Sequence, residues 1–533
     1  MKAKRILAAF LAAATCLSAM SVTAFAAKAN EFETAHEAAA NMHAGINIGN
    51  TLSSIAADYE PVDYFTGDGV NRCWDENHQG PDPEAYETAW GNPVITKEYI
   101  AAIKNAGFDS VRLDVTWGNH ADKSGKIYEP WMDRVQEVAD MILEQDMYCI
   151  INMHHDEWFK PTKTSYAEYS KLFTKVVKQI AVRFKDYDEK LMLEAGNETA
   201  VKLEEKDGKL VDTLRAGGDG VTEYFGWQPE GADYIEWNNK WMQLFVDTVR
   251  KTGGNNRWRN LVIPTFGASI GTGPNGDAQN TPEVFDEFKL PKDEYEGHLI
   301  IDIHYYLPTS FCFPDHQVDP KYATSEWGSE YDVWKLENDF AYMNTLQEKT
   351  GAPLIIGEWG VVYKNNDDEV AEYIEAYLNQ ANKYGMTTFW FDPINTLDGG
   401  IFIRWWDFST YKDQDFGIFN RSNAKVGWTE AADAIILYSY QGKLPAPKLN
   451  GTKKGNSVTL TWNDLSGTYG YRVYEYDASS KKYKQVAFIS KNKKTIKNLT
   501  PGTHKYKVVP VAKYKGRNKN GRASNVLKVT IAG

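Results

Sequence analysis

The stretch LMLEAGNE (191–198) begins as an apolar run and ends on a polar amide and a bare carboxylate, Asn197 and Glu198. Continuous apolar character is typical of a strand buried on both faces, as in a parallel sheet. An unpaired charge is costly to bury, so the carboxylate is either a solvated loop residue or a functional group. The other strands of the chain decide between these interpretations.

Seven further apolar runs occur between residues 43 and 392, separated by segments with helical periodicity. In one such segment Thr96 is suited to the N-cap and Gly107 to the C-cap. Eight strands alternating with helices predict an α/β fold, a (β/α)8 barrel. A doubly wound sheet is the alternative, although no glycine-rich phosphate loop follows any strand. The eight runs are HAGINIG (43–49), SVRLDV (110–115), YCIINMH (148–154), LMLEAGNE (191–198), NLVIPTF (260–266), LIIDIHYY (299–306), PLIIGEWG (353–360) and MTTFWFD (386–392).

The chain divides into segments of different composition. Residues 1–26 have the pattern of a signal peptide, with basic residues, an Ala-rich apolar stretch and a small-x-small cleavage site, so we expect a secreted, extracellular protein. Residues 27–442 form the expected barrel domain, and 443–447 a short linker stiffened by two prolines. Residues 448–533 alternate apolar and polar positions, which predicts a small all-β sandwich. No segment after the signal approaches the ~20 apolar residues of a membrane span.

The formal net charge of −13 is unevenly distributed. Residues 445–533 carry nineteen Lys and Arg against three Asp and Glu, a net of +16, so the rest of the chain carries −29. An acidic barrel domain argues against nucleic acid or an anionic polymer as substrate and suits a neutral one. The basic segment would favour an anionic surface such as a cell envelope, and a merely solvated sheet face is the alternative.

Three cysteines follow the expected cleavage site, Cys73, Cys149 and Cys312, so at most one disulfide forms. Cys149 lies inside an apolar run and is interpreted as a core residue. No Cys/His spacing suggests zinc. We expect no metal and no cofactor.

Polar side chains recur where the apolar runs stop. In a barrel the carboxyl ends of the strands meet on one face, where the active site is assembled. Six of the eight strands contribute, and two of the residues are carboxylates on well-separated strands. Hydrolysis of a glycosidic bond requires such a pair. The residues are Arg112, His154, His155, Asn197, Glu198, His304, Tyr306, Glu358 and Trp390.

Motifs through about residues 40–430 resemble the clostridial-type endoglucanases of glycoside hydrolase family 5. They are GINIGNTL (45–52), ETAWGNP (87–93), GFDSVRLDVTWGNH (107–120), INMHHDEW (151–158), LMLEAGNE (191–198), FVDTVRKTGGNN (245–256), IHYYLP (303–308) and IIGEWG (355–360). The resemblance implies a retaining endo-β-1,4-glucanase with Glu198 as acid/base and Glu358 as nucleophile. It further implies that Arg112 supports the charge of Glu358, Asn197 binds the sugar 2-hydroxyl, His304 and Tyr306 assist the acid and the nucleophile, and His154 and His155 line the subsite at the cleavage point.

A retaining mechanism needs an acid of raised pKa and a nucleophile of low pKa. We therefore expect Glu358 to lie beside Arg112, and Glu198 to lie among neutral neighbours.

The sequence departs from the family pattern in three places. Thr199 replaces the usual proline after the acid/base, and a long acidic segment follows to about residue 235, so we expect altered subsites and retained catalysis. Asp114 replaces a second usual proline; it would compete for Arg112 or be held in a structural hydrogen bond. The alignment of the eighth-strand tryptophan is ambiguous by one position, and Trp390 is chosen.

Seventeen tryptophans are many for this length, and flat aromatic rings stack on sugars. Trp117 and Trp158 directly follow the second and third strands, so they are the strongest subsite candidates. Others on expected loops would be divided between subsites and core: Trp74, Trp90, Trp237, Trp327, Trp405 and Trp406.

The expected partner is a β-glucan such as cellulose, bound by a monomer. Xyloglucanase, lichenase or mannanase activity on the same fold remains an alternative, as does a non-catalytic glycan-binding protein on an inactivated barrel. A metal site at HHDE (154–157) is disfavoured because adjacent strand residues point to opposite faces. The C-terminal segment resembles a fibronectin type III-like module.

Overall fold

The computed structural model describes residues 32–54, 83–88, 90–122, 124–156, 158–199, 201–206, 209–212, 221–224, 231–270, 282–314, 321–394, 401–403, 410–412 and 415–533. The expected signal peptide, Cys73, Trp74, Trp405 and Trp406 lie outside these residues.

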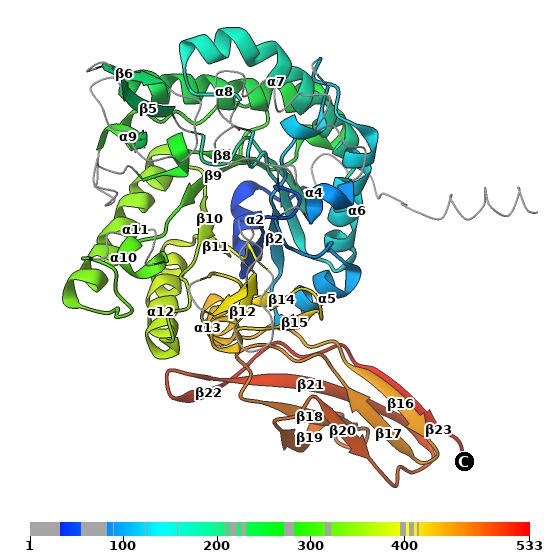
Figure 1. The fold of residues 1–533 in the computed structure, drawn as a ribbon. Helices are drawn as coiled ribbons and strands as arrows, with labels where there is room; N and C mark the ends of the chain where they lie inside the picture. The colour runs from blue at the N-terminus through cyan, green and yellow to red at the C-terminus, as the bar shows by residue number, and fades with distance from the viewer. Residues whose placement is uncertain are drawn as a thin grey trace, which may run out of the picture.

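Eight parallel strands close into a barrel in the order β1-β11-β10-β9-β8-β4-β3-β2 (Figure 1). Each strand lies within one of the eight predicted apolar runs, so the barrel prediction is confirmed. The strands are β1 (Gly45–Ile48), β2 (Ser110–Leu113), β3 (Tyr148–Ile151), β4 (Leu191–Glu194), β8 (Leu261–Pro264), β9 (Leu299–His304), β10 (Leu354–Trp359) and β11 (Thr387–Trp390).

Helices surround the barrel (Figure 1). In α5 the hydroxyl of Thr96 accepts from the backbone N–H of Tyr99, and Gly107 ends the helix in the left-handed conformation, as predicted. The helices are α2 (Ala35–Asn41), α4 (Pro83–Glu87), α5 (Lys97–Ala106), α6 (Glu129–Glu144), α7 (Lys163–Phe184), α8 (Gly231–Lys251), α9 (Pro282–Glu287), α10 (Thr309–Cys312), α11 (Glu330–Thr350), α12 (Asp367–Tyr384) and α13 (Thr429–Ser439).

The interior of the barrel is apolar at one end and polar at the other. Helix α2 closes the amino-terminal end and packs against inward-facing Ile150, Met192, Ile300 and Ile355. Alternate strand residues point the same way, so the residues two positions farther along also face inward. On β4 and β9 these are Glu194 and Asp302, which are almost completely buried. The polar layer therefore lies at the carboxyl end of the strands.

The C-terminal region is all β, as predicted. One sheet has the order β16-β17-β20, and the other has the order β19-β18-β21-β22 with β23 paired to β21. Strands β16 and β22 were not predicted. The strands are β16 (Asn450–Lys454), β17 (Ser457–Thr461), β18 (Gly470–Asp477), β19 (Lys482–Ile489), β20 (Lys493–Ile496), β21 (Gly502–Tyr514), β22 (Arg517–Asn520) and β23 (Leu527–Ile531).

This region packs against the barrel domain. The N–H of Ser466 and the side-chain amide of Asn463 donate to carbonyls at the end of α5, at 3.0 Å each. Barrel helices run antiparallel to the strands, so the end of α5 lies near the amino-terminal end of the barrel. The C-terminal strands therefore contact the barrel away from the carboxyl ends of its strands.

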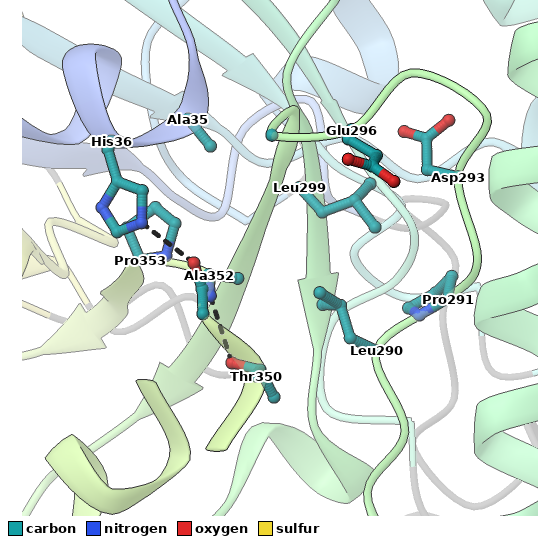
Figure 2. A pocket seen from close by; sticks show the side chains of 12 residues that line it. Ala35, His36, Leu290, Pro291, Asp293, Glu296, Leu299, Thr350, Ala352 and Pro353 are labelled. Carbon is teal, nitrogen blue, oxygen red and sulfur yellow. Dashed lines mark hydrogen bonds between the residues drawn. The ribbon is translucent and has the colours of Figure 1, made fainter. Parts of the chain in front are cut away.

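A pocket of about 170 Å³ also lies near the amino-terminal end, between α2 and the segments that precede β9 and β10. Figure 2 shows His36 hydrogen-bonded across it to a backbone oxygen, that of Gly351, at 3.0 Å. This pocket lies on the face opposite Glu198 and Glu358. Among the described residues, no helix combines the length and apolar character that crossing a membrane requires.

Buried Arg259 connects several chain segments around β4 and β8. It is fully buried, and its guanidinium donates to the side chain of Asn256 and to the carbonyls of Phe184, Tyr187, Asp188 and Leu191. We expect Arg259→Lys to lower the free energy of unfolding by about 2–4 kcal/mol, because a single ammonium cannot reach all these acceptors. Urea unfolding followed by circular dichroism measures the loss. The control is exposed Arg257→Lys, and equal stability of the two variants would contradict the prediction.

Candidate active site

The site is built around the guanidinium of Arg112 on β2, which is fully buried. Its Nε and Nη2 donate to the two carboxylate oxygens of Glu194 at 2.8 and 3.0 Å. Nη1 donates to Glu358 at 2.8 Å and to Asn47 at 3.0 Å, and Nη2 also donates to Asn197 at 2.7 Å. One cation therefore holds side chains from β1, β10 and both β4 and its following loop.

A bulge in β10 aims Glu358 into the barrel. Ile356 pairs with Ile303 and Glu358 pairs with His304, so two steps on β10 match one on β9. Gly357 occupies the extra position, and its N–H donates to Asp302 at 2.8 Å. A Cβ there would lie 2.2 Å from an Asp302 oxygen, which only glycine avoids. Bulges of this kind re-aim a side chain.

Glu358 has three partners besides solvent. Arg112 donates to one carboxylate oxygen, the hydroxyl of Tyr306 donates to the other at 2.9 Å, and His304 Nδ1 lies 3.5 Å away. Burial raises the pKa of Glu358, and the negative charge of Glu198 adds to this. The positive charges of His304 and Arg112 oppose the rise without cancelling it, so the pKa stays above its usual value. Glu358 lies beside Arg112 as expected, but its pKa in the free protein is not low.

Glu198 does not lie among neutral neighbours. His304 Nδ1 is 2.7 Å from its carboxylate, and the other ring nitrogen lies 3.2 Å from Asp302. Burial acts to lower the pKa of His304, but Glu358 and Asp302 outweigh it and raise that pKa well above the ordinary value. Burial in turn raises the pKa of Glu198, and hydrogen bonding to positive His304 outweighs this and lowers it. The expected environment was wrong because the histidine next to the acid is itself charged.

The geometry allows two-carboxylate chemistry. Oxygens of Glu198 and Glu358 and a ring nitrogen of His304 all lie within 4.8 Å of one another. The side chain of Glu198 is 39% exposed and that of Glu358 is 6% exposed. One carboxylate therefore meets solvent while the other is fixed below it.

The remaining predicted polar residues also lie around this pair. Asn197 accepts from Arg112 through its side-chain oxygen, so its amide N–H groups take no part in that contact. His154 is buried, and burial and nearby positive groups lower its pKa well below the usual value, so the ring is neutral. His155 is half-buried, with its ring 4.6 Å from that of His154 and 5.6 Å from that of Trp90.

Asp114 takes a fifth, weaker place at the guanidinium. Its Oδ1 accepts from Arg112 Nη1 at 3.4 Å and lies 3.7 Å from His154 Nδ1, and its buried Oδ2 has no hydrogen-bond partner among the described residues. Burial raises the pKa of Asp114 to about 7, despite the opposing charge of Arg112. It lies next to Arg112 as expected and does not displace Glu358, and the hydrogen bond from Arg112 agrees with the structural role that was expected.

Three site residues were missed from the sequence: Asn47, Glu194 and Asp302. Each lies inside an apolar run at an inward-facing position, two residues beyond a buried apolar or glycine position. A polar residue inside such a run is the signal that would have found them.

Two predicted subsite tryptophans are core residues. Trp117 is fully buried, and its indole N–H donates to the Asn152 carbonyl at 2.9 Å. Trp158 is 4% exposed and packs edge-on against Phe159 and Tyr169. Both rings are buried, so neither is open to stacking on a sugar.

Trp390 is also buried. Its indole N–H donates to the Phe416 carbonyl at 2.8 Å, and its ring lies edge-on to Trp359. The next residue, half-buried Phe391, lies edge-on to Tyr306 with ring centroids 6.4 Å apart. The buried ring of Trp390 is therefore closed to stacking on a sugar, and Phe391 is the aromatic residue beside Tyr306.

Thr199 is held against the barrel domain, since its carbonyl accepts from the N–H of Gly267 at 3.0 Å. The segment after it forms a three-stranded antiparallel sheet in the order β6-β5-β7. The strands are β5 (Val201–Lys206), β6 (Lys209–Asp212) and β7 (Val221–Tyr224). The insertion thus contributes structure next to the acid/base candidate.

Cys149 and Cys312 are both buried free thiols, and the core assignment of Cys149 is confirmed. Two groups near the site have the spacing of metal ligands: Asp114, His154 and Glu358, and Glu198, His304 and Glu358. Arg112 and positively charged His304 already neutralise these carboxylates, and a divalent cation beside them would be repelled. The arrangement favours proton transfer and nucleophilic attack over metal binding.

Comparisons with known proteins agree with this geometry. A family model described as cellulase (glycosyl hydrolase family 5) matches residues 74–395. Endoglucanase A of Clostridium longisporum is 32% identical over 411 residues, which cover 77% of this chain and 66% of that protein.

Solved structures show the same likeness. A GH5-4 broad specificity endoglucanase from Clostridium longisporum has a TM-score of 0.61 and 30% identity, over 77% of this chain and 99% of that one. A second, from Ruminococcus champanellensis with bound cellotriose, has a TM-score of 0.59 and 29% identity, over 76% and 98%. The chain therefore belongs to the cellulase family of glycoside hydrolases, glycosyl hydrolase family 5.

Proposed function

We propose that this glycoside hydrolase is a retaining endo-β-1,4-glucanase that cleaves cellulose or related β-glucans outside the cell. The observation that carries the proposal is the placement of the Glu198 and Glu358 oxygens within 4.8 Å of one another. Retaining glycosidases hold their two carboxyl groups about 5–5.5 Å apart, whereas inverting enzymes hold them about 6.5–9.5 Å apart. The relatives described as endoglucanases, one of them with bound cellotriose, support the substrate class.

In the first step an oxygen of Glu358 attacks the anomeric carbon. The bond to the leaving oxygen breaks, and that oxygen takes a proton from Glu198. Arg112 and Tyr306 hold Glu358 from two sides, which fixes its direction of attack. In the second step Glu198 takes a proton from water, and the water oxygen displaces Glu358 from the sugar.

His304 is the residue that exchanges a proton with the acid, Glu198. In the free protein the proton lies on charged His304, whose Nδ1 is 2.7 Å from Glu198, and Asp302 on the other side of the ring favours this charged form. The short distance allows the proton to pass to Glu198. Glu198 acts as acid when it holds that proton. Once that proton has passed to the leaving oxygen, the His304 ring is neutral, and the positive charge that still favours the Glu198 carboxylate is that of Arg112.

The acidic barrel domain and the resemblance leave xyloglucan, mixed-linkage glucan and mannan as alternative polymers. The first 26 residues support secretion. The sheet orders β16-β17-β20 and β19-β18-β21 support a fibronectin type III-like module at the C-terminus. A barrel that binds glycans without cleaving them is disfavoured because both carboxylates and Arg112 are in place.

Substitution of each carboxylate tests the mechanism. We expect Glu198→Gln to lower activity on β-glucan about 10²- to 10⁴-fold, the usual contribution of a general acid. Glu358→Gln should lower it at least as much, because the covalent route is lost. Reducing-sugar release from carboxymethyl cellulose, barley β-glucan, xyloglucan, glucomannan and xylan measures the effect and identifies the polymer.

A substrate with a good leaving group separates the two roles. Dinitrophenyl cellobioside needs no proton to depart, so Glu198→Gln should still release its dinitrophenol in an initial burst while Glu358→Gln should not. Exposed Glu296→Gln, on the opposite face, is the matched control and should match the wild type. Wild-type activity on polymer in either site variant would contradict the assigned roles.

Asp114 should control the alkaline side of the pH profile. Above about pH 7 it ionises beside Arg112 and competes with Glu358 for the guanidinium. The groups that act on it are Arg112, His154, Glu358, His304 and Arg421. In Asp114→Asn this ionisation is lost, so the alkaline limb of kcat/KM should move upward by about one pH unit.

Stability gives a second measure of Asp114. The folded protein holds this proton more tightly than the unfolded chain, so wild-type stability falls as pH rises from 3.8 to about 7. The Asp114→Asn variant should lack the contribution of this group to the loss of stability over that pH range. Parallel pH profiles of activity and of melting temperature for the two proteins would contradict the assignment.

A further inference from the structure

Helix α11 exposes a pair of aromatic side chains, Tyr331 and Trp334, that are not part of the hydrophobic core. Trp334 is 56% exposed, and it alone is classed as exposed among the tryptophans whose side chains the structure describes. Tyr331 is 65% exposed, and its ring centroid lies 5.8 Å from that of Trp334 with 31° between the ring planes. The two side chains are three residues apart and share one face of the helix. Large aromatic side chains are normally buried, and exposed patches of them mark interaction sites, so the pair is a candidate binding site.

The pair lies toward the same face as the active site. Barrel helices run antiparallel to the strands, so the first turns of α11 are near the carboxyl ends of β9 and β10. Those strands carry His304 and Glu358. The chain that leads from Tyr306 into α11 also exposes Tyr322, which is 59% exposed.

The surrounding charges indicate what can bind. Glu330 and Glu337 are exposed on α11, and Lys335 on the same helix is neutralised by Asp339 at 2.6 Å. An anionic polymer would be repelled here, whereas a neutral sugar ring offers C–H groups to the aromatic faces. The basic C-terminal strands have the opposite charge and do not share this preference.

We propose that Tyr331 and Trp334 form a binding platform for a neutral β-glucan chain, engaging sugars beyond those that contact the carboxylate pair. This proposal rests on the proposed function, because the platform would bind the same polymer that the active site cleaves. It holds long chains near the site and contributes nothing to cleavage of short substrates.

Affinity electrophoresis tests the platform in the full chain. In a Glu358→Gln background, which leaves the polymer intact, mobility is measured in native gels with barley β-glucan. We expect Tyr331→Ala with Trp334→Ala to weaken binding about 3- to 10-fold, the range of one or two aromatic contacts. Tyr469→Ala, at 53% exposure in the C-terminal region, is the matched control and should leave binding unchanged. All variants should keep the wild-type melting temperature, because exposed rings are replaced.

Kinetics with Glu358 intact provide the second readout. The double variant should raise KM on long β-glucan and leave kcat/KM on a short aryl cellotrioside unchanged. Equal polymer binding by variant and parent would overturn the proposal, as would a change in sedimentation that shows the pair joins two copies of the chain. If the wild type cleaves no glucan, the proposed function fails. If the wild type cleaves glucan and the double variant binds and cleaves it equally well, the platform alone fails.

Discussion

The buried charge of Arg112 is the constraint on which the site depends. A guanidinium out of contact with water is tolerated only when acceptors surround it, and removing one leaves an uncompensated charge. Glu194 takes two of its N–H groups from within the barrel, and Glu358, Asn47 and Asn197 take the others. The chain thus meets a folding requirement with the same contacts that position the nucleophile candidate.

The balance of charges around Arg112 explains the titration behaviour of the layer. Five described carboxylates, Asp114, Glu194, Glu198, Asp302 and Glu358, lie near two cations, Arg112 and His304. Burial raises the pKa of Glu194 to about 8 and that of Asp114 to about 7, so these two remain protonated in mildly acidic solution. The free protein therefore lowers the excess negative charge of this layer by holding protons on Asp114 and Glu194, while His304 stays charged. Substrate that excludes water would strengthen every one of these interactions.

Much of the barrel could be predicted from the sequence, because strands buried on both faces have uninterrupted apolar sequences. The functional face followed from the residues that end those runs. Asn47, Glu194 and Asp302 escaped because they lie inside the runs, where only the inward or outward direction of a side chain reveals a polar layer. That Trp117, Trp158 and Trp390 are buried depends on tertiary packing, which no local pattern states. Trp334 was not among the subsite candidates, because only tryptophans on expected loops were considered.

The β10 bulge shows the same limit. Gly357 next to Glu358 is visible in the sequence, yet the need for glycine comes from Asp302 on the neighbouring strand. Whether Glu358 then forms a covalent bond to the sugar is the central claim, and mechanism-based labelling tests it directly. The full chain is incubated with a 2-fluoro-cellobioside that carries a good leaving group, and intact mass and peptide mapping are recorded. The account predicts one added glycosyl unit, attached to Glu358. Polymer hydrolysis without any labelled protein, or a label on Glu198, would contradict it.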